Sequence, residues 1–434
     1  MPSCPSTASP CLMPAAPSHP HPSTRGNRHD GLRVLPWLLA FGLGIGGCGH
    51  TPLPKDSAII TPSAPIGSAA PPAPAAAAAS SPAHTGASDT ALSAQTSAVS
   101  SPEVNEVRLP PSDPDSYAQR EDARRLAQEL AQRHDLDPDW VWSVLSQARF
   151  KDSVPKLMMP PATPTAKNWT AYRARFLESP RIKAGAQFWK THEAALQRAE
   201  TQYGVPASVI AGVLGVETQY GRTMGRYRVL DALATLSLDF PKGRSDRSAF
   251  FQQELGEFLL MCQEQKLEPT AVLGSFAGAI GWPQFMPSSI RKFAVDFDGD
   301  GRIDLINSPV DAIGSIAHYL AEHGWQRGQP AYYSVTPPTP GADLDALLAP
   351  DILPTFSARD MEARGATLSD AGRRHEGLLA LVLLHNGGQR PTLVAGTANF
   401  YAVTRYNQSS YYALAVVQLG DAVAKEWAKQ APRN

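Results

Sequence analysis

The sequence predicts a mainly helical protein whose folded part follows a long N-terminal region, and three observations support this prediction. From about residue 117 onward, apolar residues recur with the helical period, as in YAQREDARRLAQELAQRH. Strand patterns are confined to AYYSV and to the region 381–403. No repeat of 20 to 50 residues is apparent, which argues against a solenoid. We therefore expect a helical domain over 116–430 with a small mixed α/β subdomain at 326–400.

The expected helices carry their own start and stop signals. In LDPDWVWSVLSQARF, Asp137 suits the N-cap and Pro138 the first turn. The stretch SPRIKAGAQFWKTHEAALQRAETQYG predicts one helix that starts at Ser179 and Pro180 and stops at Gly204. The same helical spacing occurs in RVLDALATLSLDF, SAFFQQELGEFLLMCQEQK, SPVDAIGSIAHYLAEHG and SSYYALAVVQLGDAVAKEW.

Residues 1–47 are expected to be a signal peptide. Three arginines precede an apolar run of about 14 residues, too short for a transmembrane helix of about 20 but suited to a signal-peptide core. The run ends in IGGC, which resembles a bacterial lipobox with Cys48 as the lipidated residue; the alternative is a signal peptide or anchor whose cysteine is incidental. The segment before the run is long, so the true start, at Met1, Met13 or later, is open. If the organism sorts lipoproteins by an aspartate after the cysteine, Gly49 at that position indicates an outer-membrane destination.

Residues 48–115 are expected to form a disordered tether rich in Ala, Pro and Ser, with almost no aromatic residues to bury. Some 65 such residues have a mean reach of roughly 45 Å. Cys262 is the single cysteine of the expected domain, so no disulfide is expected inside it. The net charge of -1 gives no support for nucleic-acid binding.

A single carboxylate, Glu217, stands out in VPASVIAGVLGVETQYG, which predicts a helix of about four turns over 206–221. Helical spacing places it on the apolar face of Ile210, Val213 and Leu214. An apolar environment raises the pKa of a carboxyl group, as a general acid near neutral pH requires. The alternative is a glutamate at a helix end that reaches solvent or accepts backbone hydrogen bonds.

The stretch DFDGDGRIDLIN, 296–307, matches the first part of an EF-hand loop. The matching positions are Asp296, Asp298, Asp300, Gly301, Arg302 through its carbonyl, and Asp304. Position 12, normally Glu, is Asn307, and Asp311 could supply the missing carboxylate. We expect a structural Ca²⁺ site, against the alternative of a solvated acidic turn.

Several long stretches together resemble the membrane-bound lytic murein transglycosylases of the B type, glycoside hydrolase family 103. They are GVETQYGRTMGRYRVLDALATLSLDFP, SFAGAIGWPQFMPSSIRKFAVDFDGDGRIDL, SPVDAIGSIAHYLAEHGW and YNQSSYYALAV, and the resemblance covers roughly 117–430. It implies a lysozyme-like helical core with an EF-hand-like calcium loop. It also implies cleavage of the β-1,4 bond between N-acetylmuramic acid and N-acetylglucosamine in peptidoglycan, with formation of a 1,6-anhydromuramoyl end.

The resemblance also implies roles for particular residues. Glu217 would be the catalytic acid and base. The calcium site would use Asp296, Asp298, Asp300, Arg302 and Asp311. The saccharide groove would be lined by Ser275, Gln284, Tyr319, Tyr406, Asn407 and Tyr412. For three of these the residues alone leave another reading: Ser275 lies in a small-residue run suited to close packing, and Tyr319 and Tyr412 have the spacing of core residues.

Two other functions stay open at this point: a muramidase that adds water, and a peptidoglycan-binding lipoprotein without catalysis. Hydrolytic glycosidases generally need two carboxylates. The sequence shows no second carboxylate in as apolar a pattern as Glu217, which favours the transglycosylase. We expect a lipid-anchored enzyme of the bacterial periplasm whose partners are glycan strands and the membrane, with no organic cofactor.

Overall fold

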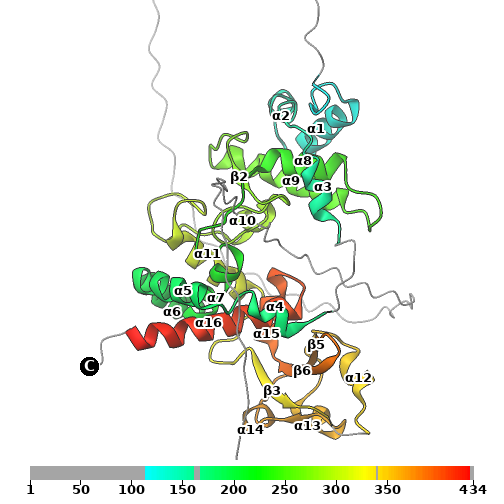
Figure 1. The fold of residues 1–434 in the computed structure, drawn as a ribbon. Coiled ribbons are helices and arrows are strands. Elements are labelled where there is room, and N and C mark those ends of the chain that lie inside the picture. The colour runs from blue at the N-terminus through cyan, green and yellow to red at the C-terminus, as the bar shows by residue number, and fades with distance from the viewer. Residues whose placement is uncertain (1–112, 161–166, 339–340, 431–434) are drawn as a thin grey trace, which may run out of the picture. The chain divides into compact units, whose positions relative to one another are not determined.

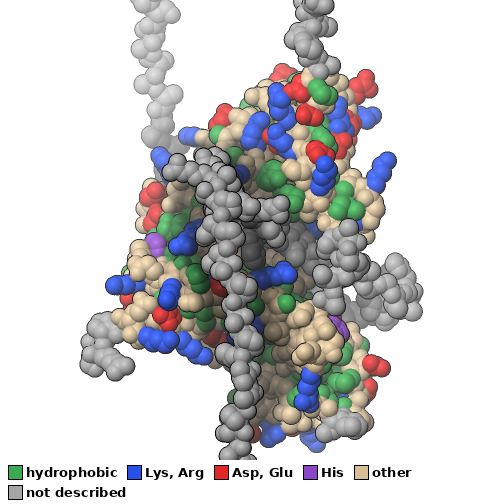
Figure 2. All heavy atoms as spheres, viewed as in Figure 1, with side chains coloured by type: hydrophobic (Ala, Val, Ile, Leu, Met, Phe, Trp, Pro, Cys, Tyr) green, Lys and Arg blue, Asp and Glu red, His purple; other side chains and the backbone are tan. Residues whose placement is uncertain are grey.

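The computed structural model describes residues 113–160, 167–338 and 341–430. The expected signal peptide, Cys48 and nearly all of the tether lie outside these residues. The described part is mainly helical, as predicted, with one four-stranded and one two-stranded sheet (Figure 1). None of its helices combines the length and the apolar character needed to cross a membrane. On the face shown in Figure 2, Lys and Arg side chains are interspersed with Asp and Glu side chains.

One group of helices surrounds the pair α8 and α9 (Figure 1). Its members are α1 (Glu121–His134), α2 (Pro138–Leu145), α3 (Ser153–Met158), α8 (Val229–Leu238), α9 (Ser248–Glu264) and α10 (Pro287–Phe293). Asp137 caps α2 as expected, accepting hydrogen bonds from the backbone of Asp139 and Trp140.

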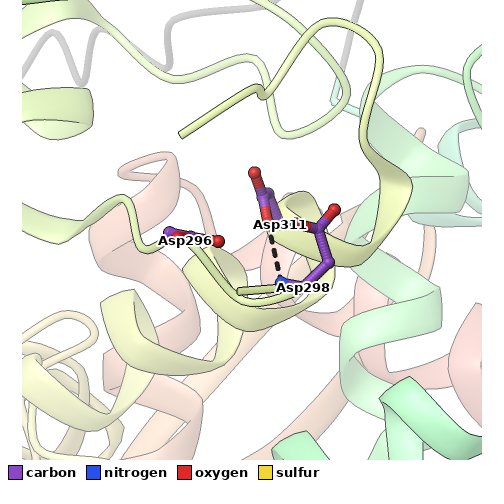
Figure 3. Close-up of side chains that lie close together, drawn as sticks. All are labelled: Asp296, Asp298 and Asp311. Atoms are coloured by element: carbon purple, nitrogen blue, oxygen red, sulfur yellow. Dashed lines mark hydrogen bonds between the residues drawn. The ribbon is translucent and has the colours of Figure 1, made fainter. Parts of the chain in front are cut away.

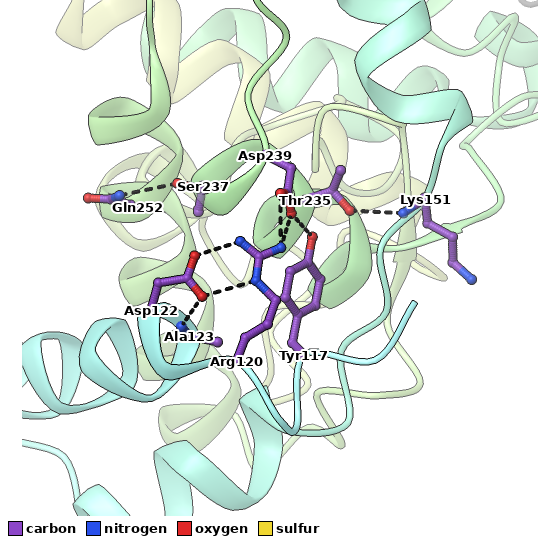
Figure 4. Close-up of polar contacts among 9 residues, drawn as sticks. All are labelled: Tyr117, Arg120, Asp122, Ala123, Lys151, Thr235, Ser237, Asp239 and Gln252. Atoms are coloured by element: carbon purple, nitrogen blue, oxygen red, sulfur yellow. Dashed lines mark hydrogen bonds and ion pairs between the residues drawn. The ribbon is translucent and has the colours of Figure 1, made fainter. Parts of the chain in front are cut away.

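The start of the described chain is tied to the end of α8 by a polar network (Figure 4). The Tyr117 hydroxyl donates to Asp239 at 2.7 Å, and Arg120 forms ion pairs with both Asp122 and Asp239. Asp239 is the C-cap of α8. These contacts fix the segment before α1 against the helical core.

A second group of helices packs around α7 and α16. It contains α5 (Ser179–Thr191), α6 (Glu193–Tyr203), α7 (Ala207–Glu217), α11 (Pro309–Glu322), α15 (Ala398–Tyr406) and α16 (Ser410–Gln430). The single helix predicted over 179–204 is wrong: the chain bends at His192, which has φ -115° and ψ 24° and separates α5 from α6. Gly204 ends α6 in a left-handed conformation, as predicted.

Two glycines let α7 and α16 pack at close range. A Cβ atom at Gly212 would collide with the Val416 carbonyl, and one at Gly420 with the Ser208 carbonyl. Only residues without a side chain fit at such backbone contacts. This packing sets the start of α16 beside the end of α7.

The four-stranded sheet lies within the region predicted to be mixed, with strand order β4-β3-β6-β5. The strands are β3 (Tyr332–Thr336), β4 (Thr367–Leu368), β5 (Ala380–Asn386) and β6 (Gln389–Gly396), and all pairs are antiparallel. The short helices α12 (Leu344–Leu348), α13 (Ala358–Ala363) and α14 (Asp370–Arg373) accompany it, and α4 (Trp169–Ala174) contacts β5 and α16. The two-stranded sheet pairs β1 (Tyr227–Arg228) with β2 (Leu273–Gly274).

The strand prediction for 381–403 is correct only as far as Gly396. Beyond it the chain forms α15, because the Thr397 side chain accepts a hydrogen bond from the backbone of Asn399 and so caps a helix. This correction places Tyr406 and Asn407 at a helix end.

Candidate active site

Glu217 is the last residue of α7, and the chain turns sharply directly after it. The helix predicted over 206–221 is therefore shorter than expected. Gln219, Tyr220 and Gly221 have φ angles of 52°, 58° and 81°, all in the left-handed region. Each non-glycine residue in this conformation costs roughly 1–2 kcal/mol. We call residues 218–221 the Glu217 turn.

Buried contacts hold the Glu217 turn in this conformation. The Tyr220 ring is buried, and its hydroxyl occupies a slot where a Cβ atom at Gly185 or Gly215 would collide with it. The fully buried Thr218 accepts a hydrogen bond from the Gly221 backbone at 3.1 Å and donates one to the Trp282 carbonyl at 3.1 Å. The local strain is thus offset by contacts with α5 and with the segment around Trp282.

The carboxyl group of Glu217 meets the start of α16. The Tyr412 hydroxyl donates a hydrogen bond of 2.6 Å to Oε1 of Glu217. Burial raises the pKa of Glu217 from its ordinary value of 4.5 to about 7, although the hydrogen bond from Tyr412 acts in the opposite direction. The raised pKa expected from the sequence is therefore present, and Glu217 can exchange a proton near neutral pH.

Three tyrosines predicted as site residues gather beside Glu217. The ring centroids of Tyr406 and Tyr412 are 6.3 Å apart, and those of Tyr319 and Tyr406 are 4.9 Å apart. Tyr406 donates to the Pro283 carbonyl at 2.7 Å, and Tyr319 donates to the Arg405 carbonyl at 2.8 Å. Burial, with a smaller contribution from the charge of Glu217, raises the pKa of Tyr406. Tyr319 and Tyr412 are buried core residues that also lie beside this site. Their interpretation as core residues is therefore compatible with a role in the saccharide groove.

The other predicted groove residues differ in their positions. Gln284 has φ 52°, and its amide donates to the carbonyls of Met224 and Gly281. Asn407 is the C-cap of α15, directly after Tyr406. Ser275 is buried, and its hydroxyl accepts hydrogen bonds from the backbone of two residues in its own turn, Ala277 and Ala279. The contacts of Ser275 are those of a turn residue.

Sequence reasoning missed two neighbours of the site: Trp282, whose carbonyl accepts the hydrogen bond from Thr218, and Tyr172. Burial, and then the charge of Glu217, raises the pKa of Tyr172 to about 12, so this tyrosine of α4 lies near the site. Its ring packs at 5.8 Å from that of Tyr411, the residue before Tyr412. The spacing of Trp169 and Tyr172 on α4 indicates an aromatic helix face, but spacing alone cannot separate a site from a core.

The acidic loop brings Asp311 back to the aspartates predicted to bind a cation (Figure 3). One carboxylate oxygen each of Asp296, Asp298 and Asp311 lies within 4.8 Å of the others. Asp311 is buried in the first turn of α11 and accepts hydrogen bonds from the backbone of Phe297, Asp298 and Asp304. Asp311 therefore lies beside the two loop aspartates, and its role in place of the missing Glu stays a prediction. Asp300 lies outside this group, and its carboxylate accepts from the backbone of Arg302.

The chemistry of this group fits a hard cation. No ion pair found among the described residues gives Asp296, Asp298 or Asp311 a Lys or Arg partner. Burial and the nearby Asp298 raise the pKa of Asp311, and its three backbone hydrogen bonds act against this rise. Carboxylates at such distances repel one another unless a cation neutralises them, and oxygen ligands are those that Ca²⁺ prefers.

Fold and site together define a mainly helical enzyme in which burial raises the pKa of Glu217 to about 7. The transglycosylase SLT domain family matches residues 118–421. The chain is 40% identical over 317 residues to membrane-bound lytic murein transglycosylase B of Escherichia coli strain K12, covering 71% of this chain and 84% of that protein.

Solved structures are similar as well. The Escherichia coli lytic transglycosylase Slt35 in complex with calcium is 39% identical with a TM-score of 0.61, over 71% of this chain and 94% of that chain. SltB3 from Pseudomonas aeruginosa in complex with NAG-anhNAM-pentapeptide is 28% identical with a TM-score of 0.59, over 70% of this chain and 79% of that chain. The chain belongs to the transglycosylase SLT family and is a lytic murein transglycosylase with the lysozyme-like fold of these relatives.

Proposed function

We propose that the protein cleaves the β-1,4 bond between N-acetylmuramic acid and N-acetylglucosamine and leaves a 1,6-anhydromuramoyl end, with Glu217 as the single acid and base. The observation that carries this proposal is the placement of Glu217 at the end of α7, where its carboxyl group accepts a hydrogen bond of 2.6 Å from Tyr412. Burial raises the pKa of this carboxyl group to about 7. One group can therefore give and take a proton near neutral pH, two tasks that hydrolytic glycosidases generally divide between two carboxyl groups.

The reaction can proceed with one carboxyl group because the nucleophile is part of the substrate. Glu217 gives its proton to the glycosidic oxygen, and the bond from this oxygen to C1 breaks with its electron pair going to the oxygen. The C6 hydroxyl oxygen of the muramoyl residue then bonds to C1, and its proton returns to Glu217. The attack is intramolecular, so the nucleophile needs little activation. No water is consumed.

The residues around Glu217 have separate roles in this proposal. Tyr412 orients the carboxyl group through its hydrogen bond of 2.6 Å. Gln284, Tyr319, Tyr406 and Asn407 bind the sugar residues through hydrogen bonds and ring faces. Ser275 supports the binding surface through its turn. The glycan-bound structure of the relative SltB3 supports a peptidoglycan fragment as the ligand.

The same loop that contains the three aspartates binds Ca²⁺ and stabilises the domain. Asp296, Asp298 and Asp311 hold the ion through carboxylate oxygens, joined by Asp300 and by the carbonyl of Arg302. The structure of the relative Slt35 with calcium supports this part of the proposal. The ion supplies no step of the chemistry.

The N-terminal region anchors the enzyme beside its substrate. A lipid on Cys48 attaches the chain to the outer membrane from the periplasm, and residues 48–115 form the tether. The description of the Escherichia coli relative as membrane-bound supports this location. Labelling of cells with a radioactive fatty acid tests it: the wild-type chain is expected to carry label and Cys48→Ser to carry none. A labelled Cys48→Ser chain would refute lipidation at Cys48.

Digestion of purified peptidoglycan sacculi tests the proposed reaction. Mass spectrometry of the products should show muramoyl ends that are lighter by one water than hydrolytic ends. Glu217→Gln should lower the rate by about 10²–10⁴-fold, the usual contribution of an acid–base group. Glu129→Gln, an exposed position on α1, is the matched control and should keep the wild-type rate. Products with reducing ends would instead show a muramidase, and binding without any cleavage by wild type would show a binding protein.

A further inference from the structure

We propose that Trp282 is a positioning residue that couples the cation loop, residues 296–311, to the Glu217 turn. The proposal rests on the role of Glu217 proposed above. It assigns to Trp282 a function beyond shaping its own turn: occupancy of the loop by a cation and placement of the Glu217 carboxyl group depend on each other through this residue.

Trp282 is attached to the cation loop by two hydrogen bonds. Its backbone N–H donates to the Leu305 carbonyl at 2.9 Å, and its indole N–H donates to the Ile306 carbonyl at 3.1 Å. A Cβ atom at Gly281 would collide with the same Leu305 carbonyl, so the chain before Trp282 also approaches the loop closely. The positions of the Trp282 backbone and ring therefore both depend on Leu305 and Ile306 of the cation loop.

The other side of Trp282 contacts the Glu217 turn. Its carbonyl accepts the hydrogen bond of 3.1 Å from Thr218, the residue after Glu217. Its ring packs on Gly221, where a Cβ atom would lie 2.5 Å from Cη2 of the indole. Because three residues of this turn have left-handed backbones, the turn depends on such external contacts for its conformation.

Two aspartates of the cation loop, Asp304 and Asp311, hold the segment that ends at Ile306. Asp311, a member of the three-carboxylate group, accepts from the Asp304 backbone at 2.8 Å, and Asp304 accepts from the Ile306 backbone at 3.0 Å. A series of hydrogen bonds therefore connects Asp311 to Asp304 and Asp304 to Ile306. It continues from Ile306 to Trp282 and from Trp282 to Thr218. A cation that orders Asp311 also orders this series, and thermodynamic linkage makes such an effect reciprocal.

A control variant separates this coupling from the general cost of losing an indole hydrogen bond. Trp325 is buried and donates its indole N–H to the Gly204 carbonyl at 3.0 Å, at the end of α6. Trp282→Phe and Trp325→Phe each remove one such bond and keep an aromatic ring. Only the indole bond of Trp282 belongs to the series between the cation loop and Thr218 of the Glu217 turn.

The test compares these variants in the full chain by glycan cleavage, thermal unfolding and calcium calorimetry. Trp282→Phe is expected to lower kcat about tenfold with little change in KM, because small misplacement of a catalytic group is costly. It should also weaken calcium binding about fivefold, a typical coupling between sites. Trp325→Phe should lower Tm but leave kcat, KM and calcium affinity at wild-type values. Thr218→Val should lower kcat similarly, and the double variant with Trp282→Phe should lose less than the product of the two effects.

Two results would overturn the coupling: wild-type kcat and calcium affinity in Trp282→Phe with a fall in Tm like that of Trp325→Phe, or no calcium binding by the wild-type chain. Failure of the proposed function has a different signature: full activity in Glu217→Gln, products with reducing ends, or no cleavage by wild type. The calcium affinity of Trp282→Phe does not depend on the chemistry at Glu217, so it decides the coupling in either case.

Discussion

The hydroxyl group of Tyr412 lies 2.6 Å from Oε1 of Glu217 and donates a hydrogen bond to it across the contact between α16 and α7. This bond favours the charged carboxylate, whereas burial favours the neutral acid, and burial is the stronger effect. The balance of these two influences sets the pH at which Glu217 can serve both as acid and as base.

Removal of this hydroxyl should therefore change the pH profile of the reaction. In Tyr412→Phe the pKa of Glu217 rises further, because the bond that lowers it is lost. The limb of the kcat/KM profile that reports loss of the acid should shift to higher pH, and the maximal rate should fall about tenfold from poorer orientation. Tyr406→Phe is the control, since the Tyr406 hydroxyl donates to Pro283 instead. An equal shift of this limb in both variants would contradict the assignment to Tyr412.

The raised pKa of Glu217 should also reduce stability above its ordinary titration range. Its folded-state pKa of about 7 exceeds the ordinary value of 4.5, so the folded state binds the proton more tightly than the unfolded state. The stability that this group contributes is present at low pH and is lost as the pH rises from 4.5 through about 7.

Glu217→Gln removes this dependence. Between acid and alkaline pH, the free energy of unfolding of the variant should rise relative to that of wild type by about 3 kcal/mol, since one pKa unit corresponds to about 1.4 kcal/mol. Urea unfolding of both proteins at a series of pH values measures the difference. A difference that does not vary with pH would show that burial does not perturb this carboxyl group.

The slot for Tyr220 predicts a coupling between two substitutions. Gly215→Ala should displace the Tyr220 side chain and the Glu217 turn, with a loss of about 1–3 kcal/mol in stability and a lower rate. Tyr220→Phe should cost little by itself, because its buried hydroxyl has no hydrogen-bond partner among the described residues. In the Tyr220→Phe background, Gly215→Ala should be less harmful, and chemical unfolding of the four proteins measures this. Additive effects would argue against the collision.

Calcium removal should lower stability through the cation loop. A chelator should reduce Tm by several degrees, because a ligand at 100 times its Kd contributes about 2.7 kcal/mol. Asp298→Asn should abolish the response to calcium, while Asp370→Asn, an exposed aspartate on α14, should keep it. Asp311→Asn should also lower Tm in the presence of chelator, because Asp311 accepts three backbone hydrogen bonds. A wild-type Tm unaffected by either chelator or calcium would refute the site.

Local sequence patterns predicted most helices of this fold, because capping residues and helical periodicity act over a few residues. Asp137 before Pro138 and the stop at Gly204 are examples. The patterns failed where a single residue redirected the chain. His192 divides a helix that periodicity alone predicts as continuous, and the cap at Thr397 turns a strand-like segment into α15.

The sequence by itself determined that the protein is mainly helical, that Glu217 continues an apolar helix face and that aspartates cluster in an EF-hand-like loop. These properties follow from spacing along one segment. Only the tertiary structure decided that Tyr412 bonds to Glu217, that the carboxylate oxygens of Asp296, Asp298 and Asp311 lie within 4.8 Å of one another, and that Trp282 joins the cation loop to the Glu217 turn. These contacts join residues far apart in the chain, and close packing between helices, through glycines such as Gly212 and Gly420, sets their distances. The pKa of Glu217 likewise depends on burial by the whole domain, which no local pattern specifies.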